Sequence, residues 1–411
     1  MELSARGGAE PGPTALDGAR LAPARKFAIE LDVLRGLAAV LMIVNHGGYR
    51  LLGPEDASSG PLGALVFVGS FAPVLFFFAT GFGVALSVNA TGRAPDWRST
   101  GVKAVLLLLA DQLMFWRTGA MGGLDFLGFI GVSLLLVSVI ARSRHAVAVC
   151  GACIAAIVVL RYGLAPKLID PATPGGGWAW TAGVRGLRDL PYPPAPWLAY
   201  PLAGFVLGRL YAGLDIRLPA PRNRWVVIGL VAVLSLVAIA GVLAARGAPF
   251  FRWGSVSAGY FVLSLAAVIG AGLLSMGLAI ASPRIATALS LRGVASFAVV
   301  PLHYGLLDLV ARGMNPPLGG RVFVALIAIV VFACLLASKL FSRSVSAWVA
   351  GPRRAAATGT LVMLLLASIA ASLVLGADAA GLSMGAMVVG QLSVAGLLAA
   401  RSRPRAARLG G

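Results

Sequence analysis

Long apolar runs recur along the whole chain and are separated by short polar segments. A continuous apolar run of about 20 residues is long enough to cross a bilayer as a helix. A transmembrane β-barrel would instead show alternating segments of about ten residues. The pattern therefore predicts an all-α, polytopic transmembrane helix bundle of about 10–12 spans. The candidate spans are 28–48, 63–88, 102–117, 125–141, 146–162, 196–213, 225–245, 255–281, 294–311, 321–341, 358–376 and 382–400.

The composition excludes several other classes of protein. Of the 411 residues, 59% are hydrophobic and 12% are charged, whereas a soluble domain carries about 25% charged residues. A soluble globular enzyme, a disordered protein and a disulfide scaffold are therefore excluded. Residues 1–26 contain no apolar core, so we expect a disordered cytoplasmic arm instead of a signal peptide. After this arm, we expect the chain to form a membrane core over 27–341, additional membrane helices over 342–400 and a basic cytoplasmic tail over 401–411.

The net charge of +19 raises the question of nucleic-acid binding. The basic residues lie in short loops between apolar runs, which is typical of cytoplasmic loops that face anionic lipid headgroups. We therefore expect membrane lipids as partners and no nucleic acid. With both termini in the cytoplasm, 23 Lys and Arg residues lie inside and ten outside. Tryptophans near span ends predict aromatic belts, with Trp116 and Trp197 outside and Trp97, Trp225 and Trp348 inside.

The first span contains charged side chains. Placing a charged side chain in the middle of a membrane costs about 2.5–3.5 kcal/mol, so such residues usually have a structural or functional role. Arg35 and His46 are eleven residues apart, which places them on one helix face about 16 Å apart along the axis. Asp32 precedes Arg35 by three residues and can pair with it. A neutral imidazole can act as a general base, and an arginine can hold a phosphate or carboxylate. The alternative is a polar contact that only fixes helix packing.

Other polar residues interrupt later spans. Asp111 lies nearer mid-membrane and is a candidate for function. Asp125, at the start of the fourth span, either caps a helix at the interface or lines a polar path through the bundle. Asp308 either lies near the outer surface or lines the same path. Cys150 and Cys153 lie in an apolar run, which favours helix packing over a zinc or redox site. With three histidines in the chain, we expect no metal.

Two segments of the chain share an Arg-x10-His pattern. LRGLAAVLMIVNH (34–46) and LRGVASFAVVPLH (291–303) have Leu, Arg, Gly, Ala and His at equal spacing. This similarity predicts that His46 and His303 face one cavity, with Arg292 beside Arg35. Chance agreement in an Ala- and Leu-rich chain is the alternative.

Several motifs together resemble a known family. LDVLRGLAAVLMIVNH resembles the start of the membrane acyltransferase superfamily, which is marked by Arg-x10-His, and APVLFFFATGFGVALS resembles its phenylalanine-rich second span. PWLAYPLAGFVLGRLY and LDFLGFIGVSLLL are similar to segments of bacterial relatives of heparan-α-glucosaminide N-acetyltransferase. FAVVPLHYGLLDLV resembles the late segment that carries a histidine, here His303. The resemblance extends through scattered motifs over residues 27–341.

The chain departs from the human-type branch of that family at the end of the first span. That branch has a tyrosine after the asparagine and a histidine in the following loop. Here Asn45 is followed by His46, and the loop GPEDASSGP has no histidine. This difference favours His46 as the base.

The resemblance implies an acyltransferase in the inner membrane of a bacterium. It would move an acyl group, usually acetyl, from cytoplasmic acyl-CoA to a hydroxyl or amine of a sugar, glycan or glycolipid at the outer face. His46 would act as the base or carry the acyl group, Arg35 with Asp32 would position the donor, and His303 would orient the acceptor or assist proton transfer. Supporting residues would be Asn45, Asp111, Asp125 and Tyr304, and donor-binding residues would be Arg35, Arg209 and Arg292.

Two other functions fit the sequence. A secondary transporter of a small anionic or sugar-like solute would also have about twelve spans and intramembrane charges. A degenerate member that acts as a scaffold in glycan assembly is disfavoured by the intact Arg35 and His46. Acyl transfer or CoA binding would separate the enzyme from both alternatives.

Overall fold

The computed structural model describes residues 28–117, 120, 122–165, 183, 190–212, 219–247, 256–375 and 379–401. These residues form helices and no strand. The elements are α1 (Ala28–Leu51), α2 (Pro54–Ser58), α3 (Gly60–Gly69), α4 (Ala72–Thr91), α5 (Trp97–Arg117), α6 (Phe126–Ile140), α7 (Ala146–Val158), η1 (Val159–Leu164), α10 (Pro194–Trp197), α11 (Ala199–Ala212), α12 (Pro219–Ala245), α13 (Ala258–Ala281), α14 (Pro283–Leu289), α15 (Val294–Met314), α16 (Gly320–Trp348), α17 (Arg354–Leu375) and α18 (Ala380–Arg401).

Every candidate span coincides with a helix or a pair of consecutive helices. Within the described ranges, nine helices are long and apolar enough to cross a membrane. Leucine, valine and isoleucine side chains on α12, α16 and α17 are exposed, as expected of helices that face lipid. The prediction of an all-α polytopic bundle is confirmed. The arm 1–26, most of the loop 163–195 and the tail after Arg401 lie outside the described residues.

The predicted span 63–88 is not one continuous helix. It is divided at Ser70 and Phe71 into α3 and α4. The Ser70 and Phe71 amides donate to Phe67 and Val68 in tight turns, and Pro73 in the first turn of α4 has no N–H to continue the α3 ladder. The sequence pattern missed this break because apolar residues continue on both sides of it.

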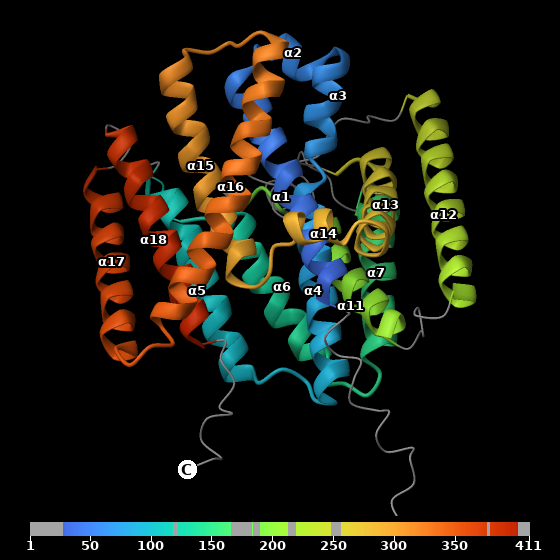
Figure 1. The fold of residues 1–411 in the computed structure, drawn as a ribbon. Helices are drawn as coiled ribbons and strands as arrows, with labels where there is room; N and C mark the ends of the chain where they lie inside the picture. The colour runs from blue at the N-terminus through green and yellow to red at the C-terminus, as the bar shows by residue number, and fades with distance from the viewer. Residues whose placement is uncertain are drawn as a thin grey trace, which may run out of the picture.

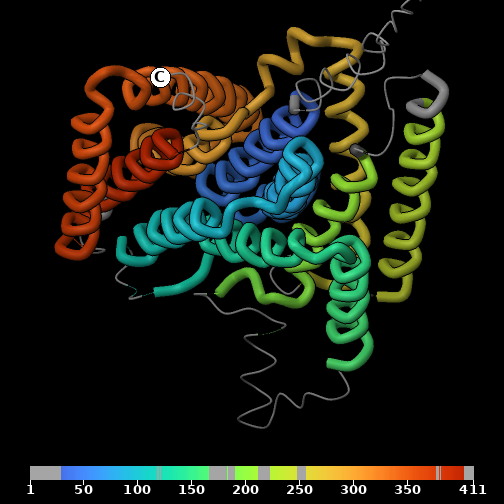
Figure 2. Tube along the Cα trace, turned by 90° about the horizontal axis from the view of Figure 1, so that it is seen from below, coloured from blue at the N-terminus to red at the C-terminus, as the bar shows by residue number. Residues whose placement is uncertain are grey.

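The helix α1 lies in the middle of the bundle (Figures 1 and 2) and contacts α3, α4, α13, α15 and α16. In Figure 1, α12 stands at the edge, packed against α13. The start of α1 and the end of α18 lie on the side opposite α2 and α3 (Figure 1). Both ends of the described chain therefore lie on one side of the bundle.

The helices α4 and α11 approach each other closely through glycines. A Cβ on Gly81 would overlap the carbonyl of Pro201, and a Cβ on Gly204 would overlap the carbonyl of Phe78. Only glycine allows two backbones to come this near. The close contact fixes α4 and its four phenylalanines relative to α11.

Trp197 was predicted to lie in the outer aromatic belt, and this prediction is wrong. Its side chain is fully buried and packs edge-on against Phe77 and Tyr192, with ring centroids 5.8 and 4.9 Å away. The end of a span need not face lipid where another part of the chain covers it. Trp97, Trp225 and Trp348 are exposed, in agreement with positions in a belt.

Candidate active site

Two charged side chains near the start of α1, Asp32 and Arg35, form an ion pair. The guanidinium of Arg35 donates to the Asp32 carboxylate at 2.9 Å. The backbone of the chain before α15 reaches the same place, because the Leu291 amide donates to the Asp32 carbonyl at 2.9 Å. Arg292 lies within electrostatic range of the Asp32 carboxylate. Arg35 and Arg292 therefore share one acidic neighbour.

Near the other end of α1, the two histidines meet. The Nδ1 of His46 lies 2.8 Å from the Nε2 of His303. The Nδ1 of His303 lies 3.1 Å from the Val299 carbonyl oxygen. The two histidines therefore meet where α1 and α15 run side by side. His46 borders a cavity and His303 does not, so the prediction that both histidines face one cavity is wrong.

The Val299 carbonyl determines which nitrogens carry protons. A carbonyl oxygen only accepts hydrogen bonds, so the His303 Nδ1 must be the donor. In a neutral His303 ring the Nε2 is then the acceptor, and the His46 Nδ1 donates to it. A neutral His46 consequently keeps its lone pair on Nε2. The chain of hydrogen bonds leaves His46 with a basic nitrogen that is not used within the pair.

Tyr304 completes an aromatic group around the histidines. Its ring stacks on His46 with the centroids 5.1 Å apart, and it lies 4.2 Å from the His303 ring. His303 is fully buried, whereas His46 is partly exposed. The packing fixes the orientation of the His46 ring and leaves His303 behind it.

A cavity of about 250 Å³ borders His46 but not His303. Its polar lining includes Asn45, Asp125, Tyr192 and Tyr304. The Asn45 side chain donates to the Val66 carbonyl at 2.9 Å, which ties α1 to α3 beside the cavity. We refer to this space as the histidine cavity. Polar groups and one carboxyl group within an otherwise apolar bundle make it suitable for a polar ligand.

A second cavity of about 400 Å³ lies toward the start of α1. Arg35, Lys103, Thr100 and Ser87 are among its polar lining residues, and we refer to it as the arginine cavity. Phe126, Leu127 and Val300 line both cavities. The two spaces are therefore neighbours that share an apolar wall. Lys103 was missed by the sequence analysis, because a lysine at the start of a span is usually explained by topology alone.

Asp111 does not line either cavity. Its carboxylate accepts from the backbone amides of Asp125 and Leu127, at 2.7 and 3.1 Å. These N–H groups lie at the start of α6, where no carbonyl within the helix can accept from them. Asp111 thus caps α6 from the neighbouring helix, and places Asp125 at the histidine cavity.

The predicted donor-binding arginines are in different places. Arg35 lines the arginine cavity, and Arg292 directly precedes its lining residue Gly293. Arg209 is hydrogen-bonded to the side chain of Asn89 and lines neither cavity. Asp308 is bonded to Arg50 and Arg312 beyond the histidines. The structure brings together Arg35, Asp32 and Arg292 at one level, and His46, His303, Tyr304, Asn45 and Asp125 at the other.

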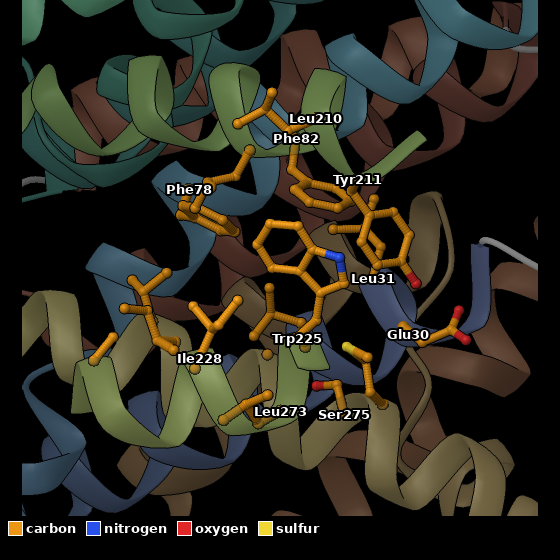
Figure 3. A pocket seen from close by; sticks show the side chains of 18 residues that line it. Glu30, Leu31, Phe78, Phe82, Leu210, Tyr211, Trp225, Ile228, Leu273 and Ser275 are labelled. Carbon is orange, nitrogen blue, oxygen red and sulfur yellow. The ribbon is translucent and has the colours of Figure 1, made fainter. Parts of the chain in front are cut away.

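A third cavity, of about 300 Å³, is almost entirely apolar. Figure 3 shows Phe78, Phe82, Tyr211 and Trp225 gathered around it, with Glu30 at its edge. It contains no histidine, so it lacks the imidazole base that borders the histidine cavity. Across the described part of the chain, no group of three His, Cys, Asp or Glu side chains could hold a metal.

A comparison with known protein families shows which family the chain belongs to. The model of the catalytic region of heparan-alpha-glucosaminide N-acetyltransferase matches residues 28–233. No curated protein matches the chain. The matched region contains Asp32, Arg35, His46, Asp111 and Asp125, and ends before His303. Family membership favours the enzyme over the transporter. The chain is a multi-pass membrane protein of the heparan-α-glucosaminide N-acetyltransferase family, a family of acetyltransferases.

Proposed function

We propose that the protein transfers an acetyl group from acetyl-CoA, on the cytoplasmic side, to an amine or hydroxyl of a sugar, glycan or glycolipid at the outer face of the membrane. The observation that carries this proposal is the His46–His303 pair, which leaves a basic His46 nitrogen beside a polar cavity. Membership of an acetyltransferase family supports the same reaction. An inner bacterial membrane is the location that we propose.

The arginine cavity would receive the donor. CoA carries several phosphate groups, and arginine and lysine are the side chains that bind phosphate. Arg35 and Lys103 both line this space, and Arg35 is oriented by Asp32. The acyl end of the donor would reach toward Phe126, Leu127 and Val300, the wall common to both cavities.

The histidine cavity would receive the acceptor. As the acceptor nitrogen or oxygen bonds to the thioester carbon, His46 Nε2 takes its proton. The C–S bond then breaks, and His46 returns the proton to the CoA sulfur. His303 would hold the reactive tautomer of His46 and stabilise the imidazolium that forms, in the manner of a base and its orienting partner. In this proposal His303 positions His46, and Tyr304 or Asn45 contacts the acceptor.

Purified protein in sealed vesicles tests the function. Acetyl-CoA would be supplied on the side of the arginine cavity and candidate amino sugars on the other, and acetylated sugar would be measured by mass spectrometry. Acetylated product that depends on His46 supports the proposal. Uptake of unmodified sugar without any CoA release would contradict it and would support a transporter.

A further inference from the structure

A group of arginines lies just beyond the histidines. Arg50 on α1 and Arg312 on α15 both pair with the Asp308 carboxylate, the second at 2.8 Å. The two arginine side chains are 46% and 50% exposed, whereas Asp308 is 10% exposed. The guanidinium groups therefore extend from a buried carboxylate toward the surface.

Arg117, the last residue of α5, joins the same group. It lies within electrostatic range of Asp308, Tyr304 and Arg50. Its Nε is buried and has no hydrogen-bond acceptor among the described residues. Two guanidiniums thus pair with one carboxylate, and a third lies within electrostatic range of it. We call Arg50, Arg117, Arg312 and Asp308 the arginine cluster.

The arginine cluster is one helical turn from the candidate active site. Arg50 follows His46 by four residues on α1, and Asp308 follows Tyr304 by four residues on α15, so each pair shares a helix face. The charge of Arg117 also reaches the Tyr304 hydroxyl. A ligand in the histidine cavity could extend a substituent of ordinary length to these arginines.

A purely structural role does not account for the whole cluster. An ion pair between Arg50 and Asp308 is sufficient to fasten α1 to α15. Asp308 has two carboxylate oxygens, while three guanidiniums offer many more N–H donors. The surplus of positive charge and the buried Nε of Arg117 both favour an additional anionic partner for the cluster.

We propose that the arginine cluster binds an oxoanion, meaning a phosphate, sulfate or carboxylate group, at the mouth of the histidine cavity. Planar guanidiniums bind such groups through paired hydrogen bonds. The oxoanion could be carried by the sugar acceptor or by a lipid headgroup. The first source makes the protein selective for acidic acceptors and rests on the proposed function, whereas the second does not require it.

Binding to protein in phosphatidylcholine nanodiscs tests the proposal. Glucosamine 6-phosphate and glucosamine differ by one phosphate, and their affinities would be compared. We expect the phosphorylated sugar to bind about tenfold more tightly. Arg117→Gln/Arg312→Gln should remove this preference, and Arg117→Lys/Arg312→Lys should retain part of it. Arg246→Gln, which removes an exposed arginine after α12, is the matched control and should change nothing.

A second arm tests the lipid source. If a headgroup supplies the oxoanion, native mass spectrometry should find phosphatidylglycerol bound to the wild type but not to the Gln double variant. Equal affinity for both sugars, together with equal lipid retention by the wild type and the double variant, would overturn the proposal. Because these are binding measurements, His46→Ala should keep the same preference. Absence of acetyl transfer by the wild type, with that preference intact, would contradict the proposed function alone.

Discussion

The Nδ1 of His46 lies 2.8 Å from the Nε2 of His303, although the two residues are 257 positions apart in the chain. Only His46 borders the polar cavity, and His303 is bonded behind it to the Val299 carbonyl. The two histidines therefore have different surroundings. One has a nitrogen available for a substrate, and the other is arranged to control the orientation of the first.

His46→Ala should abolish acetyl transfer, because the substitution removes the base. Loss of a general base costs about 10²–10⁴-fold in rate. Product formation by the purified variant in vesicles measures the loss. His145→Ala, a substitution of an exposed histidine before α7, is the matched control and should leave the rate unchanged. Near-normal turnover by His46→Ala would remove His46 from the mechanism.

His303→Ala should lower kcat and leave the KM of the acceptor nearly unchanged. Without His303, the His46 Nδ1 has no fixed partner, so the reactive tautomer is no longer enforced. We expect a loss of about 10–100-fold in kcat. His303→Gln, which can still accept from His46 Nδ1, should recover part of it. A large rise in acceptor KM with unchanged kcat would instead show that His303 contacts the acceptor.

Arg35→Lys should raise the KM of acetyl-CoA more than it lowers kcat, because lysine keeps the charge but loses the paired hydrogen bonds. Lys103→Gln should also raise the donor KM. Titrations of acetyl-CoA measure both effects. If Arg35 only neutralises Asp32, Arg35→Lys should be nearly silent. In that case Arg35→Ala should destabilise the protein, and Asp32→Asn should restore both stability and activity, which would exclude a role in donor binding.

Asp111→Ala should lower stability through α6. The carboxylate accepts two backbone amides at the start of that helix, and loss of such a cap costs about 0.5–2 kcal/mol. Thermal unfolding in detergent measures the change. Asp125, unlike Asp111, lines the histidine cavity. Asp125→Asn should therefore preserve stability and lower turnover. Equal stability of Asp111→Ala and the wild type would show that the cap contributes little.

Cysteine labelling tests the orientation in the membrane. In a background without Cys150, Cys153 and Cys334, Ser58→Cys on α2 should react with an impermeant reagent added outside the cell. Arg144→Cys between α6 and α7 should react only after the membrane is opened. Reversed labelling would place the arginine cavity outside and contradict a cytoplasmic donor.

The sequence alone determined most of the fold. Apolar runs of membrane-spanning length cannot satisfy their backbone groups in lipid except as helices, so the positions of the helices followed directly from the pattern. The break at Ser70 and the burial of Trp197 did not, because apolar residues look alike whether they face lipid or protein. The Asp32–Arg35 pair was predictable, since both residues lie one turn apart on a single helix.

Tertiary structure decided what lies around each polar group. The shared Arg-x10-His spacing suggested that His46 and His303 meet, but the tautomer of His46 depends on Val299, which belongs to another helix. Asp111 differs from a substrate-facing carboxylate only because the start of α6 packs against it. Spacing within one helix is set by its fixed geometry, whereas contacts between helices depend on how side chains throughout the bundle pack together, and no local pattern carries that information.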